Sequence, residues 1–142
     1  MKLVLDTNVV VSAVLWGGQP GHLVSIAHSG QIELFSSIPL LEELDEVLSR
    51  KRFASRVGAT GKLPSGLVVE YAQNVKLVRP ASLGRIVSDA DDDMVIGTAV
   101  AAHANLLVSG DKALLGIGAY NGVRIVSVAE AIRLIGEQLR SK

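Results

Sequence analysis

Short runs of apolar residues recur along the chain at intervals that leave room for a helix between them. A run without alternating polar residues is typical of a strand covered on both faces, as in a parallel sheet. We therefore predict buried strands at Leu3–Leu5, Ile32–Phe35, Val75–Val78, Leu106–Val108 and Val123–Val126.

Between several of these runs, apolar residues return every three or four positions, which is the spacing of one buried helix face. Residues 40–48, 95–100 and 128–139 follow this spacing and are predicted to be helices. Strands that alternate with helices form βαβ units, whose strands pair in parallel. The predicted fold class is α/β, with helices on both faces of a mainly parallel central sheet.

The stretch 50–66 departs from both patterns. Gly58, Gly61, Pro64 and Gly66 interrupt it, so we expect an irregular segment there. The stretch holds no acid, and its basic residues are Arg50, Lys51, Arg52, Arg56 and Lys62. These cations could contact RNA phosphates, or the segment could be a solvated loop beside an acidic helix.

The composition fits one compact domain. The chain has 142 residues, of which 49% are hydrophobic and 20% charged, and this is enough to bury a sizeable core. It contains no internal repeat or low-complexity tract, so we expect a single domain over residues 1–142. The formal net charge is zero, so a nucleic acid would have to be held by local features rather than by an overall basic field.

The absence of certain residues and patterns narrows the chemistry and the location that we expect for this protein. It contains no cysteine, which excludes a disulfide scaffold, a thiol nucleophile and a cysteine zinc site, and fits a cytoplasmic location. No apolar run reaches the roughly 18–20 residues that a membrane-spanning helix needs, so we expect no membrane partner. His22, His28 and His103 show no metal-ligand spacing, which leaves the acidic residues as the main candidates.

Two aspartates follow predicted strands closely. Asp6 comes directly after Leu3–Leu5, and Asp111 follows Leu106–Val108 after two small residues. In an open α/β sheet, ligands bind beyond the carboxyl ends of the strands. If the two strands are parallel neighbours, Asp6 and Asp111 lie at the same edge of the sheet.

Helix geometry adds further acidic candidates. Glu43 lies at the border of the apolar stripe of its predicted helix, where a side chain can face a cleft. Asp92 continues the inward face of the following predicted helix, whereas Asp93 lies about 100° away on the same geometry. Asp89 and Asp91 suit the first turn of that helix, where acids cap the backbone and complement the helix dipole.

Asp6, Glu43, Asp92 and Asp111 are thus inward-facing carboxylates from distant parts of the sequence. Carboxylates brought within a few ångströms of one another repel, unless some are protonated or a cation neutralises them. A hard divalent cation prefers such oxygen ligands. It could activate water and offset charge at a phosphodiester, alone or as one of two ions about 4 Å apart. The alternative for each acid is a helix cap or a surface charge.

Four segments of the chain are similar to the motifs of one known family. Leu3–Val9 resembles the opening of a PIN domain, the fold of VapC-type toxins. Leu41–Leu44 is similar to the second acidic motif of the family, with Glu43 at the acidic position. Asp89–Asp93 resembles the third motif of one PIN subgroup, and Val108–Asp111 resembles the fourth. The motifs occur in the order of the family, and the resemblance extends over nearly the whole chain.

This resemblance implies a three-layer α/β/α sandwich and a ribonuclease that depends on Mg²⁺ or Mn²⁺ and cleaves single-stranded RNA. It also implies the toxin of a toxin–antitoxin pair, with an antitoxin protein and a homodimer or higher homo-oligomer as its assemblies. Four residues would hold the metal and position the attacking water: Asp6, Glu43, Asp92 and Asp111. Three would support them by hydrogen bonds: Thr7, Asn8 and Ser109.

The third motif leaves two adjacent candidates open. Counting back from Asp111 by the spacing usual in VapC-like members leads to Asp93, whereas helix phasing and the pattern of the subgroup favour Asp92. The subgroup often has proline where this chain has Ala90. We rank Asp92 first and keep Asp93 as the alternative metal ligand.

Other functional classes share parts of this pattern. Haloacid-dehalogenase-like phosphatases place a second aspartate two positions after the first, where this chain has Asn8. Response-regulator receivers lack a glutamate contributed by a helix, which is the position of Glu43 here. A catalytically inactive PIN-like module that binds RNA or an antitoxin without cutting stays the main alternative.

Three residues outside the acidic set carry their own alternatives. Trp16 stands at a predicted helix end, where it could stack on a base or be covered by a partner, but we favour packing in the core. His103 continues the buried face of its helix and is predicted to be a hydrogen-bonded packing residue. Lys112 could contact a phosphate, but we favour an ordinary surface lysine.

Overall fold

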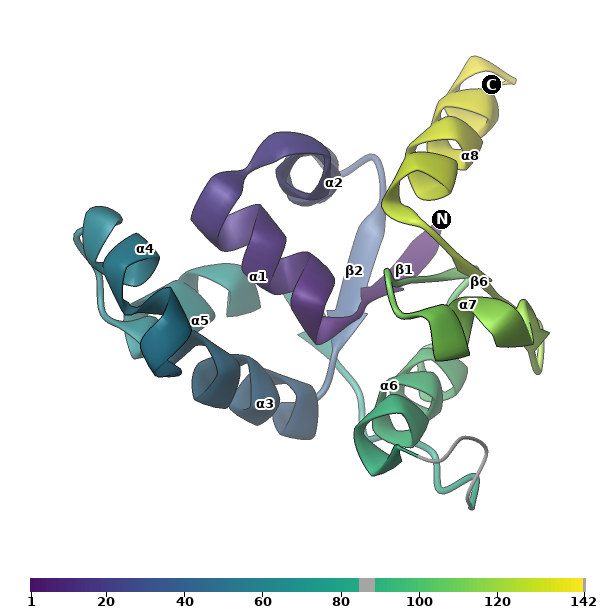
Figure 1. Ribbon diagram of the computed structural model, residues 1–142. Coiled ribbons are helices and arrows are strands. Elements are labelled where there is room, and N and C mark those ends of the chain that lie inside the picture. The colour runs from purple at the N-terminus through teal and green to yellow at the C-terminus, as the bar shows by residue number, and fades with distance from the viewer. Residues whose placement is uncertain (85–88, 142) are drawn as a thin grey trace.

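Strands and helices alternate along the part of the chain that the computed structural model describes, residues 1–84 and 89–141 (Figure 1). The strands are β1 (Lys2–Leu5), β2 (Glu33–Ser36), β3 (Val75–Leu77), β4 (Leu106–Val108), β5 (Ala119–Tyr120) and β6 (Val123–Val126). The helices are α1 (Thr7–Trp16), α2 (Gly18–His28), α3 (Ile38–Leu48), α4 (Ala54–Ala59), α5 (Pro64–Ala72), α6 (Ala90–Ala101), α7 (Lys112–Ile117) and α8 (Val128–Arg140), with a 3-10 helix η1 (Lys51–Phe53).

The strands form one sheet in the order β3-β2-β1-β4-β6-β5. All neighbouring strands pair in parallel except β5 and β6, which are antiparallel. The chain moves outward from β1 to β2 and β3, and then returns to β4 on the other side of β1. The boundary between β1 and β4 is therefore the switch point of the sheet, the usual place for a ligand in an open α/β fold.

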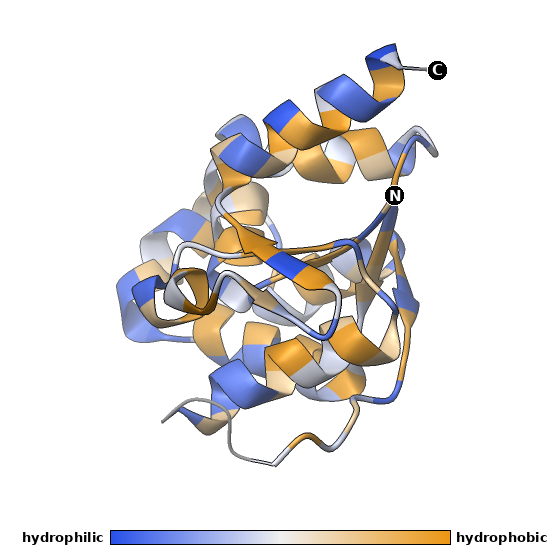
Figure 2. Ribbon diagram, turned by 90° about the vertical axis from the view of Figure 1, so that its right-hand side faces the viewer, coloured by the Kyte–Doolittle hydropathy of each residue, from blue (hydrophilic) through white to orange (hydrophobic). Residues whose placement is uncertain are grey.

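Alternate residues of the central strands face two different helix layers. Leu3 and Leu5 of β1 join a core that includes residues of α1, α2, α3 and α8, whereas Val4 packs with Val95 and Ile96 of α6. Each of these strand residues is at most 3% exposed. In Figure 2 the strands run between the two helix layers, with hydrophobic positions of the helices toward them. The prediction of an α/β fold with a mainly parallel sheet and helices on both faces is confirmed.

The expectation of an irregular segment at 50–66 was wrong, because this stretch is mostly helical. It contains η1, α4 and the start of α5. Val57 and Leu67 are each 5% exposed and belong to the same core as the buried residues of α1. Tertiary packing thus stabilises helices that are too short to form alone. Pro64 occupies the first turn of α5, which is a common helix-start position for proline. The antiparallel strand β5 was also not predicted.

Two residues expected to pack inside the protein lie at its surface. Trp16 is 54% exposed at the last position of α1. His103 lies beyond the end of α6, where it is exposed and has a φ of 52°. His103 lies past the last residue of α6, so the predicted helical phase no longer applies to it. Trp16 is still part of α1, but it lies on an exposed side of the last turn.

The first two helices meet at a sharp bend. Gly17 has a φ of 75°, in the left-handed region that favours glycine, and the axes of α1 and α2 differ by 94°. Within residues 1–84 and 89–141, no single helix has both the length and the apolar character needed to cross a membrane. Among the described residues, only the bent pair of α1 and α2 has that combined length and apolar character, by length and composition alone.

Candidate functional site

The paired strands β1 and β4 bring two predicted site segments to one edge of the sheet. Leu5 pairs with Val108, and the amide nitrogen of Asp6 donates to the Val108 carbonyl oxygen at 2.9 Å. Ser109 and Asp111 follow β4 directly and continue along the same edge. The sheet register therefore places Asp6 beside the segment that carries Asp111, as the order of strands and acids predicted.

A buried serine links the two aspartates. The Ser109 hydroxyl donates to Asp6 Oδ2 at 2.8 Å, and the Asp111 backbone nitrogen donates to Ser109 Oγ at 3.0 Å. The other oxygen of Asp6, Oδ1, accepts from the Thr7 backbone nitrogen at 2.9 Å. Ser109 is 0% exposed and Asp6 is 8% exposed. Both oxygens of Asp6 are thus held in fixed directions, since each accepts a hydrogen bond from a buried group.

The start of α6 supplies a third carboxylate. Asp89 caps this helix by accepting from the Asp91 backbone nitrogen at 2.9 Å, as predicted for a helix-start residue. One turn later, Asp92 is 8% exposed and its side chain is hydrogen-bonded to that of Asp111. Asp93 is half-buried and lines a different hollow. Of the two adjacent candidates, Asp92 is the one that the structure brings to Asp6 and Asp111.

Helix α3 presents Glu43 to the same group from the side of α1. Glu43 is half-buried and its carboxylate accepts a hydrogen bond from the Thr7 side chain. Asn8, in contrast, is exposed, and it lines a neighbouring hollow rather than the acid group. Within the described residues, no hydrogen bond joins the Asn8 side chain to the carboxylates. We call Asp6, Glu43, Asp92 and Asp111 the acid cluster.

Burial and mutual repulsion raise the pKa of three members of the acid cluster. For Asp6 and Glu43, the largest cause is burial, which disfavours the charged form, and nearby carboxylates add to it. For Asp92, burial, the hydrogen bond with Asp111 and the negative charges of Asp111 and Asp6 raise the pKa to about 7. A proton on Asp92, or a cation in its place, would therefore relieve the repulsion within this group.

Two acids outside the predicted set also act on the acid cluster. The negative charge of Asp89 raises the pKa values of Asp6, Glu43 and Asp92, and that of Asp91 raises the pKa of Glu43. The sequence interpretation treated Asp89 and Asp91 only as helix-start residues. The signal for this influence was their position one and three residues before Asp92, because such neighbours lie within one helical turn of it.

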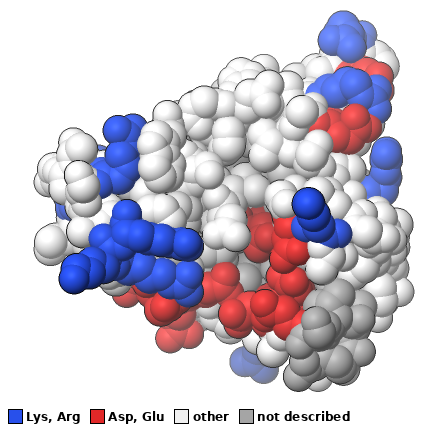
Figure 3. Space-filling view, viewed as in Figure 1, with Lys and Arg blue, Asp and Glu red and all other residues white. Residues whose placement is uncertain are grey.

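The surface around the acid cluster is divided by charge. Figure 3 shows acidic side chains around a hollow near the start of α6 and the side of α3. Basic side chains gather beside them over η1 and α4. A chain with zero net charge thus carries adjacent negative and positive regions on one face, and each can act locally on a charged ligand.

The donor chemistry of the acid cluster fits a hard divalent cation. Its oxygen atoms belong to carboxylates, which Mg²⁺ and similar ions prefer, and the raised pKa of Asp92 reports negative charge that a cation would neutralise. In the described part of the chain, no three acidic or histidine side chains are already close enough to form a complete cage. The cluster thus has suitable ligands, and binding an ion requires adjustment of their side chains.

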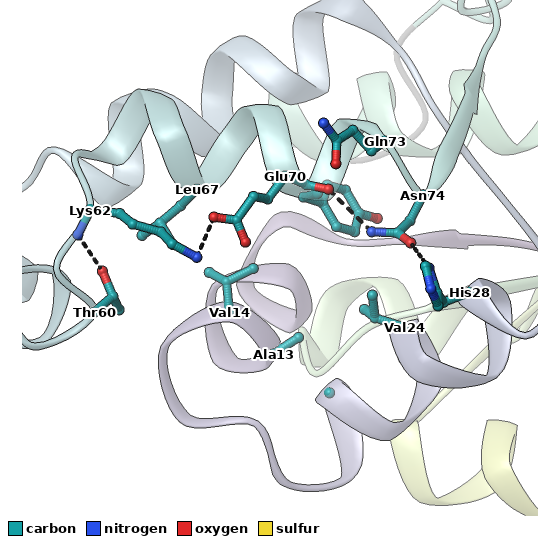
Figure 4. A pocket seen from close by; sticks show the side chains of 12 residues that line it. Ala13, Val14, Val24, His28, Thr60, Lys62, Leu67, Glu70, Gln73 and Asn74 are labelled. Carbon is teal, nitrogen blue, oxygen red and sulfur yellow. Dashed lines mark hydrogen bonds and ion pairs between the residues drawn. The ribbon is translucent and has the colours of Figure 1, made fainter.

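A second hollow lies away from the acid cluster, between α1, α2 and α5 (Figure 4). It has a volume of about 430 Å³. An ion pair between Lys62 and Glu70 and a contact of 3.3 Å between His28 Nδ1 and Asn74 Oδ1 occupy its rim. Because its acid is already paired with a lysine, this hollow does not offer a group of free carboxylates.

The fold and the acid cluster define a class of protein: α/β sandwiches with acidic side chains gathered at the switch point of a mainly parallel sheet. The family model described as PIN domain matches residues 2–113, and this chain belongs to that family. Members of the family are generally nucleases that use divalent metal ions.

A chain of one solved structure has a similar fold. It comes from the crystal structure of VapBC2 from Rickettsia felis bound to a DNA fragment from their promoter. The TM-score is 0.61 at 15% sequence identity, and the match covers 89% of this chain and 98% of that chain. A search of curated proteins found no match.

Proposed function

We propose that this protein is a metal-dependent endoribonuclease that cleaves single-stranded RNA and acts as the toxin of a toxin–antitoxin pair. The observation that carries the proposal is the acid cluster, in which distant parts of the chain bring their carboxylates together at the switch point of the sheet. Membership in a family of nucleases supports the same reading.

In this proposal Asp6, Asp92 and Asp111 hold Mg²⁺ or Mn²⁺. The bound ion supplies charge at the scissile phosphate and lowers the pKa of a water molecule. Glu43 is half-buried, with a raised pKa, and this suits a carboxylate that accepts a proton from the attacking water. Asp93 is the alternative ligand, placed second because it lines another hollow.

Two hydroxyl residues position the carboxylates. Ser109 donates to Asp6 and accepts from the backbone of Asp111, so it sets the relative direction of two proposed ligands. Thr7 contacts Asp6 through its backbone nitrogen and Glu43 through its side chain. Neither residue needs to touch the RNA to influence its cleavage.

An antitoxin protein and a homodimer or higher homo-oligomer complete the proposal. Its support is family membership and the similar fold of a chain found in a VapBC2 complex with promoter DNA. We place the protein in the cytoplasm, where its RNA substrate would be found. A short reading frame directly upstream, encoding a DNA-binding-like protein, would support the toxin role over that of a housekeeping nuclease.

Cleavage of single-stranded RNA with Mg²⁺ or Mn²⁺, compared with cleavage in EDTA, tests the nuclease. We expect EDTA and Asp6→Asn each to abolish cleavage. Asn removes the ligand charge at nearly constant volume and is also a good helix cap, so circular dichroism should be unchanged. Asp45→Asn, at an exposed position of α3, is the matched control and should cleave normally. Full activity in EDTA would exclude the metal mechanism, and an active Asp6→Asn would exclude this site.

A further inference from the structure

An exposed tryptophan lies at the far end of α1 from the acid cluster. Trp16 is 54% exposed and is the only aromatic among the strongly exposed large apolar residues of the described chain. Its ring meets the Phe53 ring edge-on, with centroids 6.2 Å apart and planes at 70°. Covering so much exposed apolar surface would be favourable, and aromatic side chains at such positions are typical binding residues.

Two arginines surround the aromatic pair. The Arg56 guanidinium carbon lies 5.3 Å from the centre of the Trp16 ring, and the Arg52 guanidinium carbon lies 4.7 Å from that of Phe53. Arg56 also donates to the Leu15 carbonyl oxygen at 3.0 Å, which fixes its guanidinium at the end of α1. We call Trp16, Phe53, Arg52 and Arg56 the Trp16 patch.

The charges of the Trp16 patch are available to a ligand. Arg50 and Lys62, at the two ends of the basic stretch, pair with Glu46 and Glu70. Arg52 and Arg56, in contrast, form no ion pair with any residue in the described ranges, and both are exposed. An exposed aromatic ring flanked by guanidinium groups without ion pairs has the chemistry that single-stranded nucleic acids require, since a base stacks on the ring and phosphates meet the cations.

The Trp16 patch and the acid cluster lie at opposite ends of α1. An open hollow of about 520 Å³ is lined by Asn8, Ser55 and the members of the patch. Asn8 is two residues from Asp6, and eight residues of helical rise, about 12 Å, separate it from Trp16. Figure 3 shows the basic surface over η1 and α4 next to the acidic hollow. One extended strand can therefore contact both regions.

We propose that the Trp16 patch binds an unpaired base of the RNA substrate and its neighbouring phosphate, and so directs the strand to the acid cluster. This inference rests on the proposed function, because it assigns the path of that substrate. Trp16 stacks on the base, Arg52 meets the phosphate, and Arg56 keeps the indole in place. A base in a duplex is not free to stack on a side chain, so the patch selects single strands.

The test is binding of a labelled single-stranded RNA of about 12 nucleotides to the full chain in EDTA, followed by fluorescence anisotropy. Trp16→Ala should weaken binding by about fivefold or more, whereas Trp16→Phe should retain most of it. Val69→Ala, which truncates a 59% exposed apolar residue on α5, should have no effect. Trp16 is the only tryptophan of the chain, so its emission should change when RNA is added.

Charge is tested separately from stacking. Arg52→Gln should reduce the salt dependence of RNA binding by about one phosphate contact. Arg140→Gln, which removes the same charge from the end of α8, should not. Arg56 is unsuitable for this comparison, because its loss also removes the hydrogen bond to Leu15.

The outcomes separate this inference from the proposed nuclease. If Trp16→Ala binds RNA as tightly as the unaltered protein, the inference is wrong even when Mn²⁺-dependent cleavage is observed. If Trp16→Ala weakens binding but no metal supports cleavage, the patch is an RNA-binding site and the nuclease proposal fails. An unchanged RNA affinity together with a Trp16 emission that shifts with protein concentration alone would assign the patch to a second copy of the chain and overturn the inference.

Discussion

Asp92 combines burial with a carboxylate partner, an arrangement that a shared proton or a cation stabilises. It is 8% exposed and hydrogen-bonded to Asp111. Two ionised carboxylates close enough to share a hydrogen bond would repel each other strongly in a buried site. The raised pKa of Asp92, about 7, thus shows how the protein tolerates the pair, and it also predicts how stability changes with pH.

The metal-free protein should lose stability as the pH rises. The ordinary pKa of Asp92 is 3.8 and its folded value is about 7, so between these values the folded state binds more protons than the unfolded state. The free energy of unfolding therefore decreases with pH across this window. Urea unfolding in EDTA at several pH values measures the slope. We expect Asp92→Asn to reduce it and Asp45→Asn to leave it unchanged, and equal slopes in all three proteins would contradict the assignment.

At the scale of elements, α6 holds its position through a close backbone contact. The Gly97 carbonyl oxygen accepts from the Ala81 nitrogen at 3.0 Å. A Cβ added at Gly97 would lie 2.5 Å from the Ala81 carbonyl oxygen. The segment after β3 can thus pass directly over α6 only because residue 97 has no side chain. The same helix carries Asp92, so this contact helps to fix where the acid is presented.

Gly97→Ala should destabilise the protein, although alanine is the better helix former. Helix propensity alone would stabilise the variant by about 1 kcal/mol, but the clash with a backbone oxygen should cost about 1–3 kcal/mol more than this gain. Gly116→Ala in α7 is the matched control, because no described atom lies within 4 Å of its added Cβ. Chemical unfolding measures both. A Gly97→Ala variant as stable as the control would show that the loop moves aside freely.

For the whole molecule, the acid cluster connects elements that are distant in the chain. Asp6 follows β1, Glu43 lies on α3, Asp92 on α6 and Asp111 directly after β4. Their assembly depends on the complete sheet, since β1 and β4 become neighbours only when the chain, after β3, crosses back to the other side of β1. An ion bound by these residues would therefore stabilise the overall fold rather than one element.

Divalent ions should raise the melting temperature of the protein. An ion that binds only the folded state stabilises it by about 2.7 kcal/mol at 100 times its dissociation constant. Thermal unfolding with Mn²⁺ and with EDTA measures the difference. We expect the increase in the unaltered protein and in Asp45→Asn, but not in Asp6→Asn. An equal increase in Asp6→Asn would mean that the ion binds elsewhere.

Local patterns in the sequence were sufficient for the parts of the fold and site that depend on near neighbours. The apolar run Leu3–Leu5 predicted a buried strand, and Asp6 followed at its carboxyl end. Helical periodicity distinguished Asp92 from Asp93, because it reports which side of a helix faces inward. The structure brings Asp6, Glu43, Asp92 and Asp111 together, while their catalytic roles stay a prediction.

By itself, the sequence determined the class of fold, since the spacing of apolar residues predicts which strands and helix faces are buried. Only the tertiary structure decided the surroundings of Trp16 and the helical state of residues 50–66. The Arg56 that contacts Trp16 reaches back 41 positions to the Leu15 carbonyl oxygen. Short helices such as α4 are stabilised by packing against other elements rather than by their own residues. Such contacts leave no periodic signal in the sequence, because their partners lie far along the chain.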